Sequence, residues 1–333
     1  MPVTLKDVAA RAGVSRSAVS RTFTQGASVS KQTRDKVERA AAALGYRPNA
    51  LASSLTTGRT KLIGLISNNF RNPFFLEVFD LFTRRLQEKG LRPLLVNLSG
   101  ETDPTNSVDL LRQYSVDGVI VASSTLDPAF ARAFRDAGLP VVHSFGRPDG
   151  ASRVDVVGVD NVACGRIAGQ TLVARGYRKV AFLGGPRAAT STQDRLLGFC
   201  QALDAEGLTP GITFADAYTF EAGRITMAAA LVRCPAEAYF CGDDILSIGA
   251  MAAVRAAGLS VPGDIGLMGF NDMEMAGWPS IDLTTLHQPV ARIIESSIDL
   301  VSAHDPGDPR GPEIRLFECR LIERATLKPK VEA

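Results

Sequence analysis

The stretch TLKDVAARAGVSRSAVSR, residues 4–21, indicates the fold of the N-terminal part of the chain. Leu5 and Val8 are spaced for one face of a helix, and Gly13 permits the positive φ that ends such a helix. Ser15 belongs to the residue types that cap a helix by accepting a hydrogen bond from a backbone amide. The pattern therefore predicts two short helices joined by a tight turn, a helix-turn-helix.

The second of these helices is expected to point Arg16, Ser17 and Arg21 outward. A recognition helix presents such exposed side chains to base edges in the major groove of DNA. Two arginines on a short helix are also common on a solvated face, so the pair alone does not identify a DNA-reading surface. The next segment, SVSKQTRDKVERAAAALGY, predicts a third helix that begins after Ser30 and ends at Gly45.

The segment RPNALASSLTTGRT follows at residues 47–60. With it included, residues 3–60 resemble, without a gap, the DNA-binding headpiece and hinge of the lac repressor family of bacterial transcription regulators. Asn49 can cap a helix over residues 50–55, which is so short that it needs a partner helix or DNA to form. The resemblance implies that it pairs with its twin in a dimer and that Leu55 wedges into the minor groove. A flexible linker with one incidental leucine is the alternative.

The residues expected to contact DNA are Thr4, Ser15, Arg16, Ser17, Ser20, Arg21, Asn49 and Leu55. The charge distribution agrees with this expectation. Residues 1–60 carry ten Lys and Arg side chains against three acids, a net of +7, whereas the whole chain carries +2 and the remainder therefore −5. A basic head on a mildly acidic body suits neutralisation of DNA phosphates by the head.

Composition places the chain among ordinary globular proteins, with 45% hydrophobic and 22% charged residues. Its 333 residues suffice for a small domain and two lobes. The start MPVTLKDV is unlike a signal peptide, and no apolar run of about eighteen residues occurs, so we expect a cytoplasmic protein that does not span a membrane. The five cysteines have neither CxxC nor zinc spacing, which indicates reduced core residues; we expect no metal and no cofactor.

From Lys61 onward, apolar runs alternate with helical patterns. LIGLIS, residues 62–67, is typical of a buried strand, and FFLEVFDLFTRRLQEKG has helical spacing. A second series of such units starts near Val154, and TTLHQP and IRLFECRLIER are expected to cross back between the lobes. The fold class predicted is a small all-α headpiece plus an α/β domain of two doubly wound parallel-sheet lobes. Such sheets bind ligands outside the carboxyl ends of their strands.

The predicted organisation has a headpiece, a hinge and a two-lobed effector and dimerisation domain. The boundaries are 1–46 for the headpiece, 47–60 for the hinge helix and linker, 61–333 for the effector domain, 61–145 with 290–305 for one lobe, and 146–285 with 306–326 for the other. GVDNVACGRIAG, DRLLGF, FCGDDILSIGA and GFND make this body resemble the effector-binding domain of the same family, which shares its fold with periplasmic sugar-binding proteins.

The resemblance implies that Arg195 grips hydroxyls or a carboxylate of the effector, unless it only ties its helix to the surroundings of Asp194. Asn271 is expected to act likewise from the end of its strand, although several relatives carry Asp there. Asp243 is placed to hydrogen-bond a sugar, and Asp160 either does the same or caps its helix. Three aromatic residues match positions of a ligand wall, with core packing as the alternative: Phe75, Phe145 and Phe220.

One cation among mixed acceptors and aromatic walls fits a neutral polyhydroxylated effector, a sugar or close derivative, better than a nucleotide. We therefore expect a regulator, most often a repressor in this family, that binds operator DNA as a homodimer under control of a small molecule. Pro329 in the closing RATLKPKVEA argues against a leucine-heptad helix that would make tetramers.

An α/β enzyme and a free solute-binding protein are the alternatives. The sequence contains no GxGxxG after LIGLIS, no GxxxxGK[ST], no GxSxG and no HExxH. A catalytic triad assembles in space, so motifs alone do not exclude one. The attached headpiece and the lack of an export signal argue against a free solute-binding protein.

Overall fold

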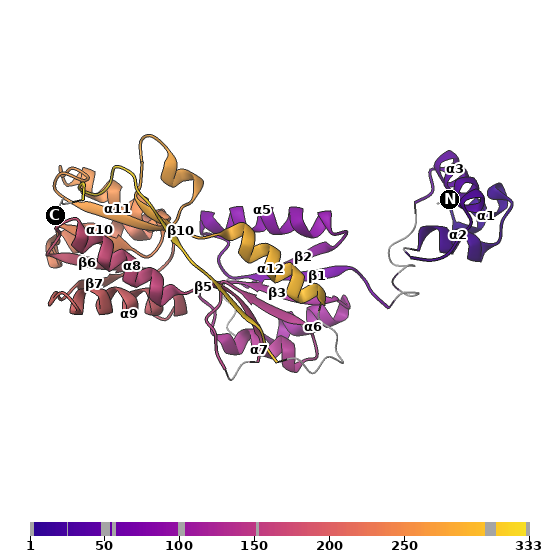
Figure 1. Cartoon of the computed structure of the whole chain (residues 1–333), viewed down its shortest axis with the longest axis horizontal. Helices are drawn as coiled ribbons and strands as arrows, with labels where there is room; N and C mark the ends of the chain where they lie inside the picture. The colour runs from indigo at the N-terminus through magenta and orange to yellow at the C-terminus, as the bar shows by residue number, and fades with distance from the viewer. Residues whose placement is uncertain are drawn as a thin grey trace. The chain divides into compact units, whose positions relative to one another are not determined.

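The computed structural model describes residues 3–24, 26–47, 54, 58–98, 104–150, 153–303 and 311–330 (Figure 1). The chain divides into two compact units, residues 1–61 and 62–333. Asn49 and Leu55, on which the expected hinge contacts depend, lie outside the described residues. The described helices include none that is long and apolar enough to cross a membrane.

The first unit contains three helices: α1 (Leu5–Ala12), α2 (Arg16–Phe23) and α3 (Lys31–Leu44). Gly13 ends α1 with a φ of 67°, and Gly45 ends α3 with a φ of 65°, as the sequence predicted. The Ser15 hydroxyl accepts a hydrogen bond from the Ala18 amide at 3.2 Å and caps α2. Six buried apolar residues form the core of this unit: Val8, Ala9, Val19, Val37, Ala40 and Ala41.

The first lobe of the second unit is a sheet in the order β11-β5-β4-β3-β1-β2, with every pair parallel. Its strands are β1 (Leu62–Ser67), β2 (Arg92–Asn97), β3 (Gly118–Ala122), β4 (Val141–Ser144), β5 (Asp155–Val159) and β11 (Ile314–Phe317). Its helices are α5 (Pro73–Glu88), α6 (Thr105–Gln113), α7 (Pro128–Asp136) and α12 (Val290–Ala303). Helices α5 and α12 run side by side over this sheet (Figure 1).

The second lobe is a sheet in the order β12-β10-β9-β8-β6-β7, parallel except where β12 meets β10. Its strands are β6 (Val180–Gly184), β7 (Gly211–Phe214), β8 (Ala238–Cys241), β9 (Gly266–Asn271), β10 (Thr285–His287) and β12 (Arg320–Ile322). Its helices are α8 (Asn161–Ala174), α9 (Thr190–Asp204), α10 (Phe220–Arg233), α11 (Asp244–Ala256) and the 3₁₀ turn η1 (Glu274–Gly277). The two parallel-sheet lobes confirm the predicted fold class.

The expected division between the lobes was wrong at two strands. β5 was assigned to the second lobe, but Val142 of β4 pairs with Asp155 and extends the first sheet. β11 was also assigned to the second lobe, but Ile314 pairs with Val156 of β5. The spacing of apolar residues identifies a strand but does not show which strand it pairs with. Because no helix separates β4 from β5, β5 adds to the first sheet before the chain passes to the second lobe.

The chain crosses between the lobes at three places among the described residues: from β5 to α8, from β10 to α12, and from β11 to β12. These crossings bring the carboxyl ends of strands in both sheets toward one region. The crossings thus define where a site between the lobes can form.

All five cysteines are free thiols, with Cys164 and Cys241 buried.

Candidate functional site

The candidate DNA-contacting side chains that the structure describes lie at the surface of the first unit. Arg16, Ser17 and Arg21 are exposed on α2, and Ser20 is half-buried. Ser15 shares a hydrogen bond of 2.9 Å between its hydroxyl and that of Ser17, in addition to capping the helix. The second helix therefore presents a cationic and hydroxyl surface to solvent.

Thr4 lies at the start of α1, where the Asp7 carboxylate accepts hydrogen bonds from its amide at 2.8 Å and its hydroxyl at 2.7 Å. These bonds hold the pKa of Asp7 below its usual value. The α2 helix is fixed from behind by Arg34 of α3, which donates to the Thr22 carbonyl at 3.1 Å. Contacts with α3 thus hold α2 in place, and a surface that reads bases requires such a rigid support.

An inner cavity lies between the two lobes of the second unit, beyond the carboxyl ends of their strands. Both lobes contribute to its wall. The lining residues are Phe74, Phe75, Ser124, Phe145, Val159, Asn161, Arg195, Tyr218, Asp243, Asn271 and Gln288. Five of the seven residues expected from the sequence to bind the effector belong to this set: Phe75, Phe145, Arg195, Asp243 and Asn271.

Arg195 is 4% exposed and is held by three contacts. Its Nε donates to the Asn161 side-chain oxygen at 2.9 Å, and its Nη1 donates to the Gly242 carbonyl at 2.5 Å. The guanidinium carbon lies 3.6 Å from the centre of the Phe270 ring, a cation–π contact. Asp194 instead pairs with Arg147, so Arg195 is not a tie to that residue. The plane of the guanidinium is therefore fixed at the edge of the cavity.

Asp243 is the acidic member of the cavity and is 3% exposed. One carboxylate oxygen accepts from the Asn72 amide at 2.8 Å and from the Asn271 amide at 3.0 Å. The other accepts from the Ile245 backbone amide at 2.9 Å and caps α11. Burial raises the pKa of Asp243 to about 6, because desolvation outweighs the hydrogen bonds and the nearby Arg195 charge. Since Asn72 belongs to the first lobe, its bond to Asp243 links the lobes directly.

Asn271 completes a polar chain across the cavity. Its side-chain oxygen accepts from the Gln288 amide at 2.6 Å, while its nitrogen donates to Asp243. Its backbone φ is 123°, an uncommon conformation for a residue with a side chain, at the end of β9. A neutral amide here places both a donor and an acceptor beside the Asp243 carboxylate.

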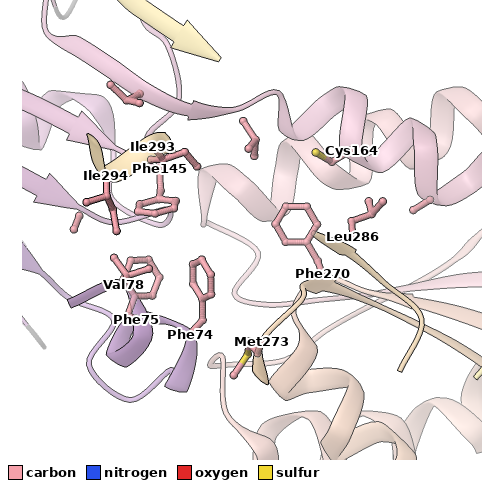
Figure 2. Packing of buried hydrophobic residues seen from close by; sticks show 14 of the residues in the cluster. Phe74, Phe75, Val78, Phe145, Cys164, Phe270, Met273, Leu286, Ile293 and Ile294 are labelled. Atoms are coloured by element: carbon pink, nitrogen blue, oxygen red, sulfur yellow. The ribbon is translucent and has the colours of Figure 1, made fainter. Parts of the chain in front are cut away.

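Aromatic side chains form the apolar wall on the first-lobe side. Figure 2 shows the rings of Phe74, Phe75 and Phe145 gathered together, with Phe270 on the second lobe. The ring centres of Phe74 and Phe145 are 5.8 Å apart and nearly perpendicular, and those of Phe75 and Phe145 have the same separation. These rings belong to the hydrophobic core as well as to the cavity wall.

Two residues expected in the cleft do not line it. Asp160 is exposed and accepts a hydrogen bond from the Ala163 amide at 2.9 Å, so it caps α8. Phe220 is 41% exposed at the first position of α10 and is absent from the cavity wall. In both cases a neighbour lines the cavity instead, Asn161 after Asp160 and Tyr218 before Phe220. A shift of one or two residues decides the direction in which a side chain at a helix start points.

Sequence reasoning missed five polar residues that line or support the site: Asn72, Ser124, Asn161, Tyr218 and Gln288. Signals for two of them were present. Asn161 lies one residue beyond the strand end in GVDN, and Gln288 lies in the quoted motif TTLHQP. Asn72, Ser124 and Tyr218 lie in loops, where no local pattern indicates which side chains turn inward.

The site carries one buried cation, one buried carboxylate, several amides and hydroxyls, and aromatic faces. This set can bind hydroxyl groups as donor and acceptor and can cover the C–H faces of a ring. Among the described residues there is no cluster of three or more His, Cys, Asp or Glu side chains that could hold a metal ion. The arrangement is thus suited to binding a polar, largely uncharged small molecule.

Comparison with known families assigns both units of the chain. Residues 4–49 match the bacterial regulatory proteins of the lacI family. Residues 60–301 match the periplasmic binding proteins and sugar binding domain of the LacI family. The HTH-type transcriptional regulator CelR of Thermobifida fusca is 31% identical over 96% of this chain and 97% of its own length. The ribose operon repressor of Escherichia coli strain K12 is 33% identical over 90% of this chain and 92% of its own.

Solved structures agree with these matches. The lac repressor dimer bound to operator and the anti-inducer ONPF has a TM-score of 0.88 and 26% identity, covering 99% of this chain and 100% of that one. The CelR–cellobiose complex has a TM-score of 0.73 and 29% identity, covering 97% and 99%. The lac repressor and CelR structures thus align with this chain over nearly its whole length. Together with the family matches, they show that the chain belongs to the LacI family of DNA-binding transcriptional regulators, not to a family of enzymes.

Proposed function

We propose that this protein is a repressor that binds a pseudo-palindromic operator as a homodimer, and that a carbohydrate bound in the inner cavity controls this binding. The observation that carries the proposal is the buried polar set of the inner cavity, in which Arg195, Asp243 and Asn271 face aromatic walls. A regulator controlled by a small molecule needs a site of this kind to bind its effector. Because operator DNA lies in the bacterial cytoplasm, the proposal also places the protein there.

The DNA-binding part of the proposal rests on the exposed face of α2. Arg16, Ser17 and Arg21 are exposed on this face and are proposed to reach base edges. Thr4, Ser15 and Ser20, at the start of α1 and along α2, are proposed to contact phosphates. Support for a dimer comes from the lac repressor, which was solved as a dimer on its operator. Two headpieces related by a two-fold axis double the contacts and set the half-site spacing.

The carbohydrate class follows from the charge and donor inventory of the cavity. Arg195 is the cation of the wall, and Asp243 is its carboxylate, so the formal charges offset each other. A phosphorylated ligand would favour several cations, whereas sugar hydroxyls are satisfied by mixed donors and acceptors. CelR was solved with cellobiose, and another relative represses a ribose operon, which supports the same class.

Control of DNA binding requires that the effector change the relation between the lobes. Asn72 of the first lobe donates to Asp243 of the second, and a sugar hydroxyl that takes the place of this amide breaks that link. Bonds to the effector then replace the bond between the lobes. The effector therefore has a different affinity for each arrangement of the lobes and shifts the equilibrium between them. Coupling of this kind is typically worth about 1–3 kcal/mol, or about 5–150-fold in operator affinity.

The test is a DNA-binding titration with operator DNA selected from a random pool. A panel of neutral sugars should contain at least one that changes operator affinity by about fivefold or more. Arg195→Ala should abolish this response while it leaves operator affinity without sugar within about twofold, because the headpiece is unchanged. Arg166→Ala, on the outer surface of α8, is the matched control and should respond as wild type does.

Two results would contradict the proposal. If Arg195→Ala responded to the sugar with wild-type affinity, the inner cavity would not be the effector site. If a purine or an amino acid bound tightly in calorimetric titration and no sugar did, the effector class would be wrong while the regulator itself remained.

A further inference from the structure

A second cavity, here called the outer chamber, lies beside the inner cavity between the same two lobes. Its volume is about 360 Å³, whereas the inner cavity leaves only about 10 Å³, roughly the space of one water molecule. Tyr218 lines both cavities, and Asn72, which lines the outer chamber, donates to Asp243 of the inner one. The two cavities are thus neighbouring compartments of one cleft.

The outer chamber is built at the carboxyl ends of strands from both sheets. The loop after β1 contributes Asn68 and Asn69, the loop after β3 contributes Thr125, and the loop after β7 contributes Asp216. Strand ends are where ligands bind in parallel sheets, and a volume of several hundred Å³ falls in the range of ligand sites. Position and size both indicate a compartment for part of a ligand.

The polar groups of the chamber are held in place but not all of them are satisfied. The Thr125 hydroxyl is 3.1 Å from the Asn68 side-chain oxygen and 3.3 Å from that of Asn69. Ser123 also donates to Asn68 at 2.8 Å. The side-chain nitrogen of Asn69, in contrast, is buried without any hydrogen-bond partner. A buried donor of this kind is uncommon. Asn69 lines the chamber, so a small rotation of its side chain would let this nitrogen donate to a ligand there.

The chemistry of the chamber fits a neutral hydroxylated group. Amides and hydroxyls provide donors and acceptors, and Ala189, Ala217 and Pro186 provide small apolar surfaces. Arg71 and Asp216 are both exposed and opposite in charge, so the chamber has no excess of cations for a phosphate. The Tyr218 ring is buried at the junction, with its hydroxyl 2.7 Å from that of Thr192, and offers a fixed face to a ring that passes it.

We propose that the effector is a disaccharide or a longer oligosaccharide. One ring enters the inner cavity against Arg195 and Asp243, and the next ring lies in the outer chamber against Asn69. The inner cavity widens to admit its ring when the bond from Asn72 to Asp243 breaks. This inference rests on the proposed function, because it extends the same effector site. It accounts for the size of the outer chamber, for its neutral polar lining and for the unpartnered Asn69 amide.

The experiment is calorimetric titration of the full-length protein with glucose, galactose, cellobiose, maltose and lactose. At least one disaccharide should bind ten times or more as tightly as its constituent monosaccharide. In Asn69→Ala the ratio of disaccharide to monosaccharide affinity should fall about tenfold, the loss typical of a hydrogen bond to a buried group. Asn106→Ala, an exposed asparagine on α6, is the matched control and should keep the wild-type ratio.

A second variant tests occupancy of the chamber without removing a polar group. Ala217→Phe fills the outer chamber, and it should weaken disaccharide binding at least tenfold more than monosaccharide binding. An unchanged ratio in this variant, or equal affinity of wild type for the disaccharides and their monosaccharides, would overturn the proposal. Melting temperatures of both variants identify any loss that comes from unfolding.

Failure of this inference is distinguishable from failure of the proposed function. Binding of a monosaccharide that depends on Arg195, without any preference for a disaccharide, overturns only the extended site. Operator binding without affinity for any sugar of the panel overturns the carbohydrate class, and the extended site with it.

Discussion

The buried carboxylate of Asp244 shows how strongly one residue depends on its surroundings. Its side chain is fully buried and accepts hydrogen bonds from the Thr285 hydroxyl at 2.6 Å and the Met273 amide at 2.9 Å. Burial raises its pKa from 3.8 to about 7, with Asp243 adding a repulsive charge. The folded state therefore holds this proton more tightly than the unfolded state does.

This raised pKa predicts a stability that depends on pH. The contribution of Asp244 is fully present below the unfolded pKa of 3.8 and is lost as pH rises through about 7. We expect the free energy of unfolding of wild type, relative to Asp244→Asn, to fall by about 2 kcal/mol between about pH 5 and about pH 8. Urea denaturation at both pH values measures it. The exposed Asp136→Asn should show no such change, and a difference that stays constant for Asp244→Asn would refute the assignment.

At the DNA surface, we expect the two exposed arginines of α2 to contact base edges directly. Arg16→Ala or Arg21→Ala should cost about 1–3 kcal/mol of operator affinity and relax base preference if the arginine holds a base pair bidentately. Lys36→Ala removes an exposed cation of α3 and should change little. Titration against operator variants measures both effects. Unaltered affinity and base preference in both arginine variants would show that α2 is not the recognition helix.

At the scale of elements, glycines set how closely α8 and α9 approach. A Cβ on Gly198 would lie 1.8 Å from the Val162 carbonyl oxygen, and one on Gly165 would lie 2.0 Å from the Arg195 carbonyl oxygen. Both contacts are with backbone atoms, so the helices themselves would have to move apart. The position of Arg195 in the cavity therefore depends on two residues that never touch a ligand.

We expect Gly198→Ala to destabilise the effector domain by about 3 kcal/mol, near the upper end for an overpacked core. It should also weaken sugar binding, because Arg195 lies one turn away on the displaced helix. Denaturation and calorimetry measure the two losses. Gly150→Ala is the control, since a Cβ there meets nothing within 4 Å. Wild-type stability in Gly198→Ala would mean that the helices do not pack as tightly as the structure shows.

At the scale of the whole molecule, a homodimer predicts a steep dependence on operator symmetry. An operator with only one half-site should bind about 100-fold more weakly than the full palindrome, because the second headpiece is already tethered when the first one binds. Fluorescence anisotropy measures both affinities, and sedimentation at micromolar concentration should give a dimer. Equal affinity for both operators, or a stable tetramer, would contradict this assembly.

The sequence predicted the ends of secondary-structure elements better than it predicted the residues of the site. Helix ends at Gly13 and Gly45 and the cap at Ser15 were predicted correctly, because each depends on bonds within a few residues. Helix α12 was not singled out, although Ile294 and Ile298 have the spacing of a buried helical face. Phe75, Phe145, Arg195 and Asn271 were expected in the cleft through the resemblance to a family, and Asp243 was expected there because it ends a strand.

The sequence by itself determined the helix-turn-helix, the alternation of strands and helices, and the charge that separates headpiece from body, since all of these are local or additive properties. Only the tertiary structure decided that β5 and β11 belong to the first sheet, that Asp160 caps a helix and that Phe220 turns outward. The site depends on contacts such as that of Asn72 with Asp243, which are 171 residues apart. No pattern within a window of the sequence contains such a pair, because folding of both lobes brings its members together.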